Sequence, residues 1–152
     1  MKKTLLLLII LLGSGFWYFN QQKNVTDEGR AIVKIGATLP LTGDGSEAGQ
    51  VTKEALQLML EHLEQRGLKY DYQLIFEDNQ MNPKMTATTT NKLIGSDKVK
   101  AVLSFWGVMS NVVSAIADKN QVISMSCAFG ENATNGKYNF NFMPTYESQA
   151  EV

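Results

Sequence analysis

Residues 31–49 read AIVKIGATLPLTGDGSEAG, and this stretch indicates the fold class. Residues 31–38 are mostly apolar and include the β-branched Val33 and Ile35, so they predict a buried strand. The following residues are rich in Pro, Gly, Asp and Ser, which favour turns, and an amphipathic helix is predicted next. A strand, a loop and a helix in this order typically open an α/β domain. The loop lies at the carboxyl end of the strand, where open α/β sheets bind ligands.

The composition is typical of a globular chain with one added apolar segment. The chain has 152 residues, of which 44% are hydrophobic and 19% are charged, and its net charge is −1. Beyond Lys2 and Lys3 the sequence has no basic cluster, which argues against nucleic-acid binding. The single cysteine, Cys127, excludes an intrachain disulfide, and its distance in sequence from His62 argues against a structural zinc site.

Residues 1–19 predict a targeting segment. Lys2 and Lys3 precede the apolar run TLLLLIILLGSGFWYF, which has the pattern of a signal peptide or a membrane anchor. The bulky aromatics at residues 16–19 make a poor cleavage region and suit a membrane interface, so they favour an anchor through residues 4–19. Either interpretation predicts that the rest of the chain is exported to a periplasmic or other extracytoplasmic location. The polar residues 20–30 are predicted to form a linker.

The remaining chain alternates between helical and strand patterns. Asn82 and Pro83 form a helix start, with Asn at the cap and Pro at the first position. Ser110 is predicted to cap a later helix, after a loop at residues 106–109. Together these patterns predict an α/β fold in three layers, with a parallel sheet, helices on both faces and the strand order 2-1-3-4-5. Strands are predicted at residues 31–38, 70–77, 100–105, 121–126 and 138–143, and helices at residues 48–66, 83–94 and 110–120.

No catalytic constellation is present in the sequence. It lacks the HExxH, P-loop and GxGxxG motifs and a plausible Ser/His/Asp set. Glu77 and Asp78 could be paired acids, but adjacent strand residues point to opposite faces, so a strand end and a helix-capping role are preferred. Cys127 has no base nearby in the sequence to activate it. We therefore expect neither an enzyme nor a cofactor.

A ligand site is predicted where the loops after the first, third and fourth strands share one edge of the sheet. Hydroxyls and backbone N–H groups at the start of the helix at Ser110 would suit a carboxylate. Trp106 and Phe129 would form an apolar wall. Each serine could equally be a cap or turn residue, and Trp106 could equally pack beneath its loop.

Residues 33–49, VKIGATLPLTGDGSEAG, resemble the opening of the amino-acid-binding proteins of ABC transporters, of the leucine/isoleucine/valine-binding type. That family has the type 1 periplasmic binding protein fold, in which a strand leads through a Pro-Leu-Thr-Gly turn and a further glycine to a helix. Asp78, followed by Asn82 and Pro83, matches the family after the second strand. The resemblance extends to the end of the chain.

The resemblance implies two α/β lobes with a ligand cleft between them, of which residues 31–152 would form an incomplete N-terminal lobe. The implied function is an extracytoplasmic solute-binding protein that captures an amino acid or similar small polar ligand for an ABC transporter permease. The extracellular sensing domain of a membrane receptor or sensor kinase is the alternative. The chain ends near the expected crossover to the second lobe, which suggests a fragment or a truncated gene product. The implied ligand contacts are Ser46, Trp106, Gly107, Ser110, Ala128 and Phe129.

Overall fold

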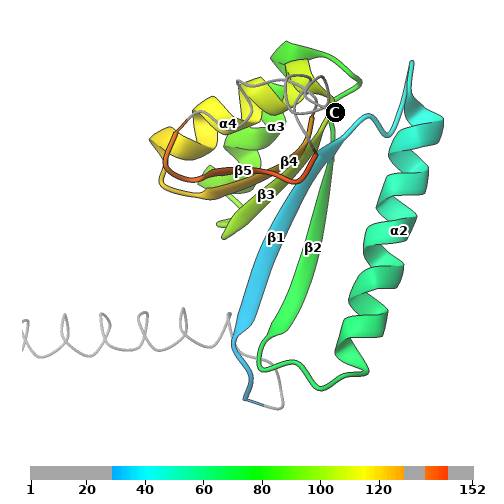
Figure 1. The fold of residues 1–152 in the computed structure, drawn as a ribbon, viewed down its shortest axis with the longest axis vertical. Helices are drawn as coiled ribbons and strands as arrows, with labels where there is room; N and C mark the ends of the chain where they lie inside the picture. Colours follow the sequence, from blue (N-terminus) through cyan, green and yellow to red (C-terminus); the bar gives the residue numbers. More distant parts are fainter. Residues whose placement is uncertain (1–28, 129–135, 144–152) are drawn as a thin grey trace, which may run out of the picture.

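The computed structural model describes residues 29–128 and 136–143, which form one parallel sheet with helices on both faces (Figure 1). The strand order is β2-β1-β3-β4-β5, as predicted. Every neighbouring pair is parallel. The strands are β1 (Ile32–Leu39), β2 (Asp71–Asp78), β3 (Ala101–Phe105), β4 (Ile123–Cys127) and β5 (Asn139–Asn141), and the helices are α2 (Ser46–Glu64), α3 (Pro83–Gly95) and α4 (Gly107–Lys119).

The helices divide between the two faces of the sheet. α2 lies over β1 and β2 on one face, whereas α3 and α4 lie together on the other (Figure 1). This arrangement confirms the predicted three-layer α/β fold class. The predicted N-terminal hydrophobic helix and most of the predicted linker fall in residues 1–28, outside the described part of the chain. Within the described part, no helix combines the length and the apolar character needed to cross a membrane.

The apolar core lies between the sheet and the layer of α3 and α4. Leu93 of α3, Val102 of β3 and Val113 of α4 are fully buried there, with Val99 nearly so. The Leu93 side chain packs directly on the backbone of Gly36 in β1, because a Cβ at Gly36 would lie only 2.9 Å from both Leu93 methyl carbons. The absence of a side chain at one strand position therefore sets how closely α3 approaches the sheet.

Hydroxyl side chains replace this apolar core near the carboxyl ends of the strands. Thr38, Ser104 and Ser126 are in register across β1, β3 and β4, and all three are fully buried. Thr38 Oγ1 lies 2.9 Å from Thr89 Oγ1 of α3, and Ser104 Oγ lies 3.0 Å from Ser110 Oγ of α4. Buried hydroxyls need partners, and Thr38 and Ser104 each find one on the helix that covers them, whereas the Ser126 hydroxyl bonds β5.

The opposite face of β3, β4 and β5 is apolar and exposed. Ile123, Met125 and Phe140 are 43%, 39% and 55% exposed, and Phe142 just after β5 is 57% exposed. Among the described residues, α2 is the helix on this face, and it lies over β1 and β2 instead (Figure 1). This side of the sheet therefore carries an apolar surface far more exposed than the core beneath α3 and α4.

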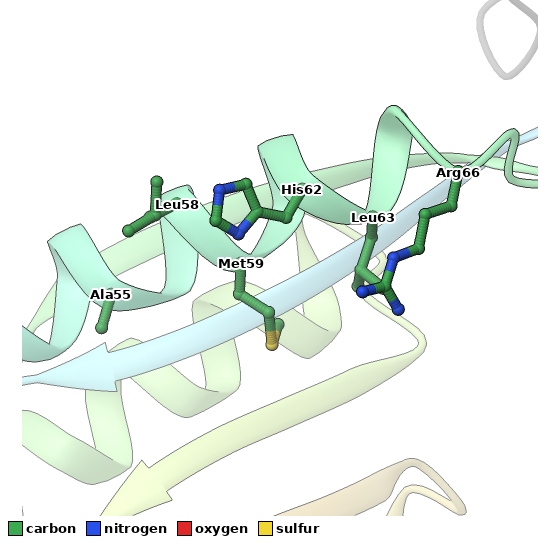
Figure 2. Close-up of a pocket in the computed structure, with 6 residues that line it drawn as sticks. All are labelled: Ala55, Leu58, Met59, His62, Leu63 and Arg66. Atoms are coloured by element: carbon green, nitrogen blue, oxygen red, sulfur yellow. The ribbon is translucent and has the colours of Figure 1, made fainter.

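A pocket of about 400 Å³ along α2 belongs to the same incompletely packed side. Figure 2 shows Met59 and Leu63 pointing toward the sheet and Leu58 pointing away from it. Because α2 begins at the carboxyl edge of the sheet, the pocket lies on the half of the helix far from that edge. We attribute it to loose packing of α2. Its lining consists of Ala55, Leu58, Met59, His62, Leu63 and Arg66.

The predicted start of α4 at Ser110 is wrong. α4 begins at Gly107, so residues 107–109 are helical rather than part of a loop. Trp106 is the residue at which the loop ends, directly before the helix begins. Its φ of 66° and ψ of 134° are non-helical, but its carbonyl oxygen already accepts the first helical hydrogen bond, from Ser110 N–H. The other elements match their predicted ranges to within one or two residues.

Candidate functional site

The candidate site lies at the carboxyl edge of the sheet, between β1 and β3. These two strands are neighbours in parallel register, with Thr38 opposite Ser104. The chain leaves β1 toward α2 on one face and leaves β3 toward α4 on the other (Figure 1). Connections that diverge in this way mark the point at which open α/β sheets bind ligands.

The two helices that begin at this point lack side-chain caps. Gly45 precedes α2 with a φ of 85°, and Trp106 precedes α4; neither provides a side-chain hydrogen bond to its helix. α3 differs, because the Asn82 side chain accepts hydrogen bonds from the N–H groups of Lys84 and Met85. The first N–H groups of a helix have no partner within it and attract negative charge. Gly45 and Trp106 therefore provide no side-chain acceptor for the first N–H groups of α2 and α4, whereas Asn82 provides one for those of α3.

Two predicted site residues are the first residues of these helices. Ser46 begins α2 and is half-buried, and its N–H donates to Gly43 O over 3.1 Å. Gly107 begins α4 and is also half-buried. Among the described residues, no neighbouring atom lies within 4 Å of a Cβ placed at Gly107, which leaves open space there beside the start of α4.

Trp106 connects the start of α4 to two strands. Its N–H donates to Cys127 O of β4 over 3.2 Å, and its ring meets Phe105 edge-on with centroids 6.1 Å apart. Residues with a Cβ rarely adopt its φ and ψ, so the Trp106 backbone is strained. Strain of this kind concentrates at functional sites, where the surrounding structure holds it in place.

Ser110 is buried, although a hydroxyl that contacts a ligand was expected at the surface of the site. It occupies the first turn of α4, is fully buried, and is hydrogen-bonded to Ser104. Its predicted role as a helix cap is therefore wrong. Its part in ligand binding stays a prediction.

Ala128 is held by a residue that was not among the predicted site residues. It is 1% exposed, and its N–H and C=O both bond the Asn141 side chain, over 3.2 Å and 2.6 Å. The same side chain donates to Met143 O, so Asn141 connects the end of β4 to the chain after β5. No local sequence pattern marks Asn141 for this role. Phe129, the other predicted residue in this loop, lies outside the described residues.

The predicted helix-capping role of Asp78 is also wrong. Its carboxylate accepts hydrogen bonds from the N–H groups of Leu41 and Thr42, from the Thr42 hydroxyl and from the Gln80 N–H. The predicted position of Asp78 at the end of β2 is confirmed, and β1 ends opposite it at Leu39. Asp78 thus connects the end of β2 to the loop that follows β1.

The described residues also bear on metal and thiol chemistry. They contain no group of three or more His, Cys, Asp or Glu side chains that could hold a metal ion. Cys127 ends β4 and is half-buried, and its burial raises the pKa of the thiol. A raised pKa keeps the thiol neutral and a weak nucleophile.

Solved structures of binding proteins share this fold. The branched-chain amino acid transporter substrate-binding protein LivJ from Streptococcus pneumoniae, in complex with isoleucine, is similar with a TM-score of 0.69 and 23% identity, over 75% of this chain and 34% of that chain. The leucine-binding protein LivK from Thermotoga maritima gives a TM-score of 0.67 and 23% identity, over 74% and 33%. A solute-binding protein of an ABC transporter from Rhodopseudomonas palustris, in complex with 3,4-dihydroxybenzoic acid, gives a TM-score of 0.67 and 19% identity, over 75% and 32%.

The chain thus spans about a third of the length of these structures. No curated protein matches the sequence. A family model described as "Periplasmic binding protein" matches residues 32–152, which is most of the chain. This match confirms the resemblance seen in the first strand and loop: the chain belongs to the periplasmic binding protein family.

Proposed function

We propose that this chain forms the first ligand-binding lobe of an extracytoplasmic solute-binding protein that captures an amino acid for an ABC transporter. The uncapped starts of α2 and α4 carry this proposal, because they lie at the divergence of β1 and β3. A ligand carboxylate would accept hydrogen bonds from backbone N–H groups at the start of α4, beginning at Gly107. The Ser46 hydroxyl would contribute from the start of α2.

The remaining predicted contacts would surround the rest of the ligand. Trp106 and Phe129 would form an apolar wall, Ala128 would contribute backbone from the β4 loop, and Ser110 would support the first turn of α4 from below. Groups for the ligand's amine are expected partly from a second lobe, since the similar structures are about three times as long as the matched part.

The similar structures support a ligand with a carboxylate. LivJ holds isoleucine and the Rhodopseudomonas palustris protein holds 3,4-dihydroxybenzoic acid, and each ligand is a carboxylic acid with an apolar portion. An uncapped helix start beside a tryptophan matches both parts of such a ligand. Branched-chain amino acids are the first candidates, and aromatic acids are the second.

Ligand-dependent thermal stabilisation tests this proposal. The protein would be expressed from its complete reading frame and heated with each common L-amino acid and with 3,4-dihydroxybenzoate. A ligand at about 100 times its Kd stabilises the folded state by roughly 2.7 kcal/mol, which gives a clear rise in Tm. No rise with any compound would overturn the proposal.

A matched pair of variants tests the position of the site. Gly107→Val adds a side chain into the open space at the start of α4 and is expected to weaken binding by roughly tenfold or more. Gly95→Val is the control, because Gly95 at the end of α3 has equally open space for a Cβ. Equal affinities in the two variants would place the ligand elsewhere.

A sensing domain of a membrane receptor or sensor kinase is the second candidate, favoured by the apolar residues 4–19. A membrane span and a signalling domain encoded downstream in the same reading frame would support it. Export and anchoring are tested together by N-terminal sequencing of the protein recovered outside the cytoplasm. An intact residue 1 in the membrane fraction would support the anchor, and a new N-terminus after residues 13–15 would support cleavage.

A further inference from the structure

Asp78 holds the loop between β1 and α2, residues 40–45, from the neighbouring strand. Its Oδ1 accepts hydrogen bonds from Leu41 N–H over 2.9 Å and from Thr42 N–H over 3.3 Å, and its Oδ2 accepts one from the Thr42 hydroxyl. A fourth bond, from Gln80 N–H over 3.0 Å, fixes the carboxylate to its own chain. Three of the four bonds therefore act on the β1–α2 loop rather than on β2.

The register of the sheet puts Asp78 at the right place for this role. β1 and β2 pair in parallel, with Leu39 opposite Asp78, so both strands end at the same level. Asn79 N–H also donates to Leu39 O over 2.9 Å, which extends the pairing by one residue. The Asp78 carboxylate thus meets the chain where it turns away from the sheet.

α2 holds the same loop from the other side. The Gln50 side chain donates to Leu41 O over 3.0 Å, so both backbone polar groups of Leu41 are bonded to side chains. Gly49 packs directly on Pro40, since a Cβ at Gly49 would lie 1.9 Å from Pro40 O. The first half of the loop is therefore fixed on two sides.

The second half of the loop depends on that fixed half. Gly43 and Gly45 adopt positive φ values of 73° and 85°, and residues 42–45 are exposed. Glycine has more conformational freedom than any other residue and loses the most on ordering. A carboxylate that fixes Thr42 limits the conformations open to the glycines that follow and so sets the position of Ser46.

We propose that Asp78 is a positioning residue for ligand binding, which fixes the β1–α2 loop so that the start of α2 faces the ligand before the ligand arrives. The inference rests on the proposed function, in which Ser46 contacts the ligand. Asp78 itself makes no contact with the ligand. Its effect on affinity comes from preorganisation, because a loop that is already ordered adds no ordering cost to binding.

The experiment compares wild type, Asp78→Ala, Asp78→Asn and Glu77→Gln in the protein expressed from its complete reading frame. Glu77→Gln is the matched control, because this adjacent carboxylate bonds Lys92 of α3 and not the β1–α2 loop. Two quantities are measured at a temperature where every variant is folded. They are the Kd for L-isoleucine by titration calorimetry and the hydrogen-exchange rates of the Leu41 and Thr42 amides without ligand.

Asp78→Ala is expected to speed exchange of both amides by roughly tenfold or more and to raise the Kd by a similar factor. Exchange in β3 and β4 should stay unchanged, as should both quantities in Glu77→Gln. Asp78→Asn should recover part of the loss, since its amide oxygen can still accept from the two N–H groups.

Unchanged amide exchange in Asp78→Ala would overturn the inference, and so would an unchanged Kd. General loss of protection across the sheet would also overturn it, because Asp78 would then act on stability and not on the loop. If wild type does not bind L-isoleucine or any other tested acid, the proposed function fails and the role in binding fails with it. The exchange measurement still decides in that case whether Asp78 fixes the loop.

Discussion

The side-chain oxygens of Ser104 and Ser110 lie 3.0 Å apart, and both residues are fully buried between β3 and α4. Replacing either serine by alanine leaves the other hydroxyl buried without this partner, so each change is expected to destabilise the fold by about 1–2 kcal/mol. The double variant removes both hydroxyls and should cost less than the sum of the two single changes by about 0.5 kcal/mol or more. Urea unfolding of the four proteins measures this coupling. Strict additivity would show that the two hydroxyls do not depend on each other.

When the ring at position 106 is removed, a glycine there should give a more stable protein than an alanine. Its φ of 66° and ψ of 134° strain any residue that has a Cβ. Trp106→Gly is therefore expected to be more stable than Trp106→Ala by about 1 kcal/mol. Both variants lose the same ring contacts, so their difference in unfolding free energy isolates the backbone. An alanine variant as stable as the glycine variant would show that this conformation is not adopted in solution.

The sequence predicts the elements of this fold well, because each is encoded by local patterns. Short runs with aliphatic or aromatic residues mark the strands, and Asn82 followed by Pro83 marks the start of α3, which the Asn82 side chain caps as predicted. The site is predicted less well, because contacts between distant residues shape it. Asp78 bonds Leu41 across 37 positions, and Asn141 bonds Ala128 across 13, and no local pattern reveals either pair.

Trp106 shows the same limit at one helix boundary. Ser110 has the residue type of a helix cap, and tryptophan does not, so local preference favours the wrong residue. The Ser110 side chain is buried and hydrogen-bonded to Ser104 instead of capping the helix. The hydrogen bond from Trp106 N–H to Cys127 O fixes the residue before the helix, which begins at Gly107. Tertiary contacts override the capping preference here.

Two glycine-to-alanine changes should have opposite effects on stability. At Gly49 the new Cβ would lie 1.9 Å from Pro40 O, so α2 or the β1–α2 loop must shift, at a cost of about 3 kcal/mol. At Gly95, the last residue of α3, no neighbouring atom in the described part of the chain lies within 4 Å of the new Cβ, and alanine should stabilise the helix by about 0.5–1 kcal/mol. Urea unfolding measures both. A neutral Gly49→Ala would mean that α2 does not pack on Pro40.

The contribution of Asp78 to stability should disappear only in acid. Partial burial opposes ionisation of Asp78, but its hydrogen bonds, foremost the one from Thr42 Oγ1, favour the charged form and hold its pKa below the ordinary value of 3.8. Because the pKa is lower in the folded state than in the unfolded state, the stabilisation is complete above 3.8 and is lost as the pH falls through the folded value.

Comparison of wild type with Asp78→Asn across pH tests this expectation. Their difference in unfolding free energy should be constant from neutral pH down to about pH 5 and should shrink at lower pH. The asparagine variant provides the baseline, because it retains the other titrating groups and lacks this one. A difference that shrinks near neutral pH would show that Asp78 does not have a lowered pKa.

The exposed face of β3, β4 and β5 should tolerate polar side chains that the buried face does not. Met125 is in register with Phe140, and both are more than one-third exposed, at 39% and 55%. The double variant Met125→Thr with Phe140→Thr is therefore expected to change the free energy of unfolding by less than about 1 kcal/mol. It should also reduce self-association, measured by light scattering, because exposed apolar patches promote association between molecules. Val102→Thr is the control on the buried face, where Val102 is fully buried, and it should cost about 1–3 kcal/mol. Equal losses from the two sets of changes would show that the apolar face is covered in solution by chain outside the described residues or by another molecule.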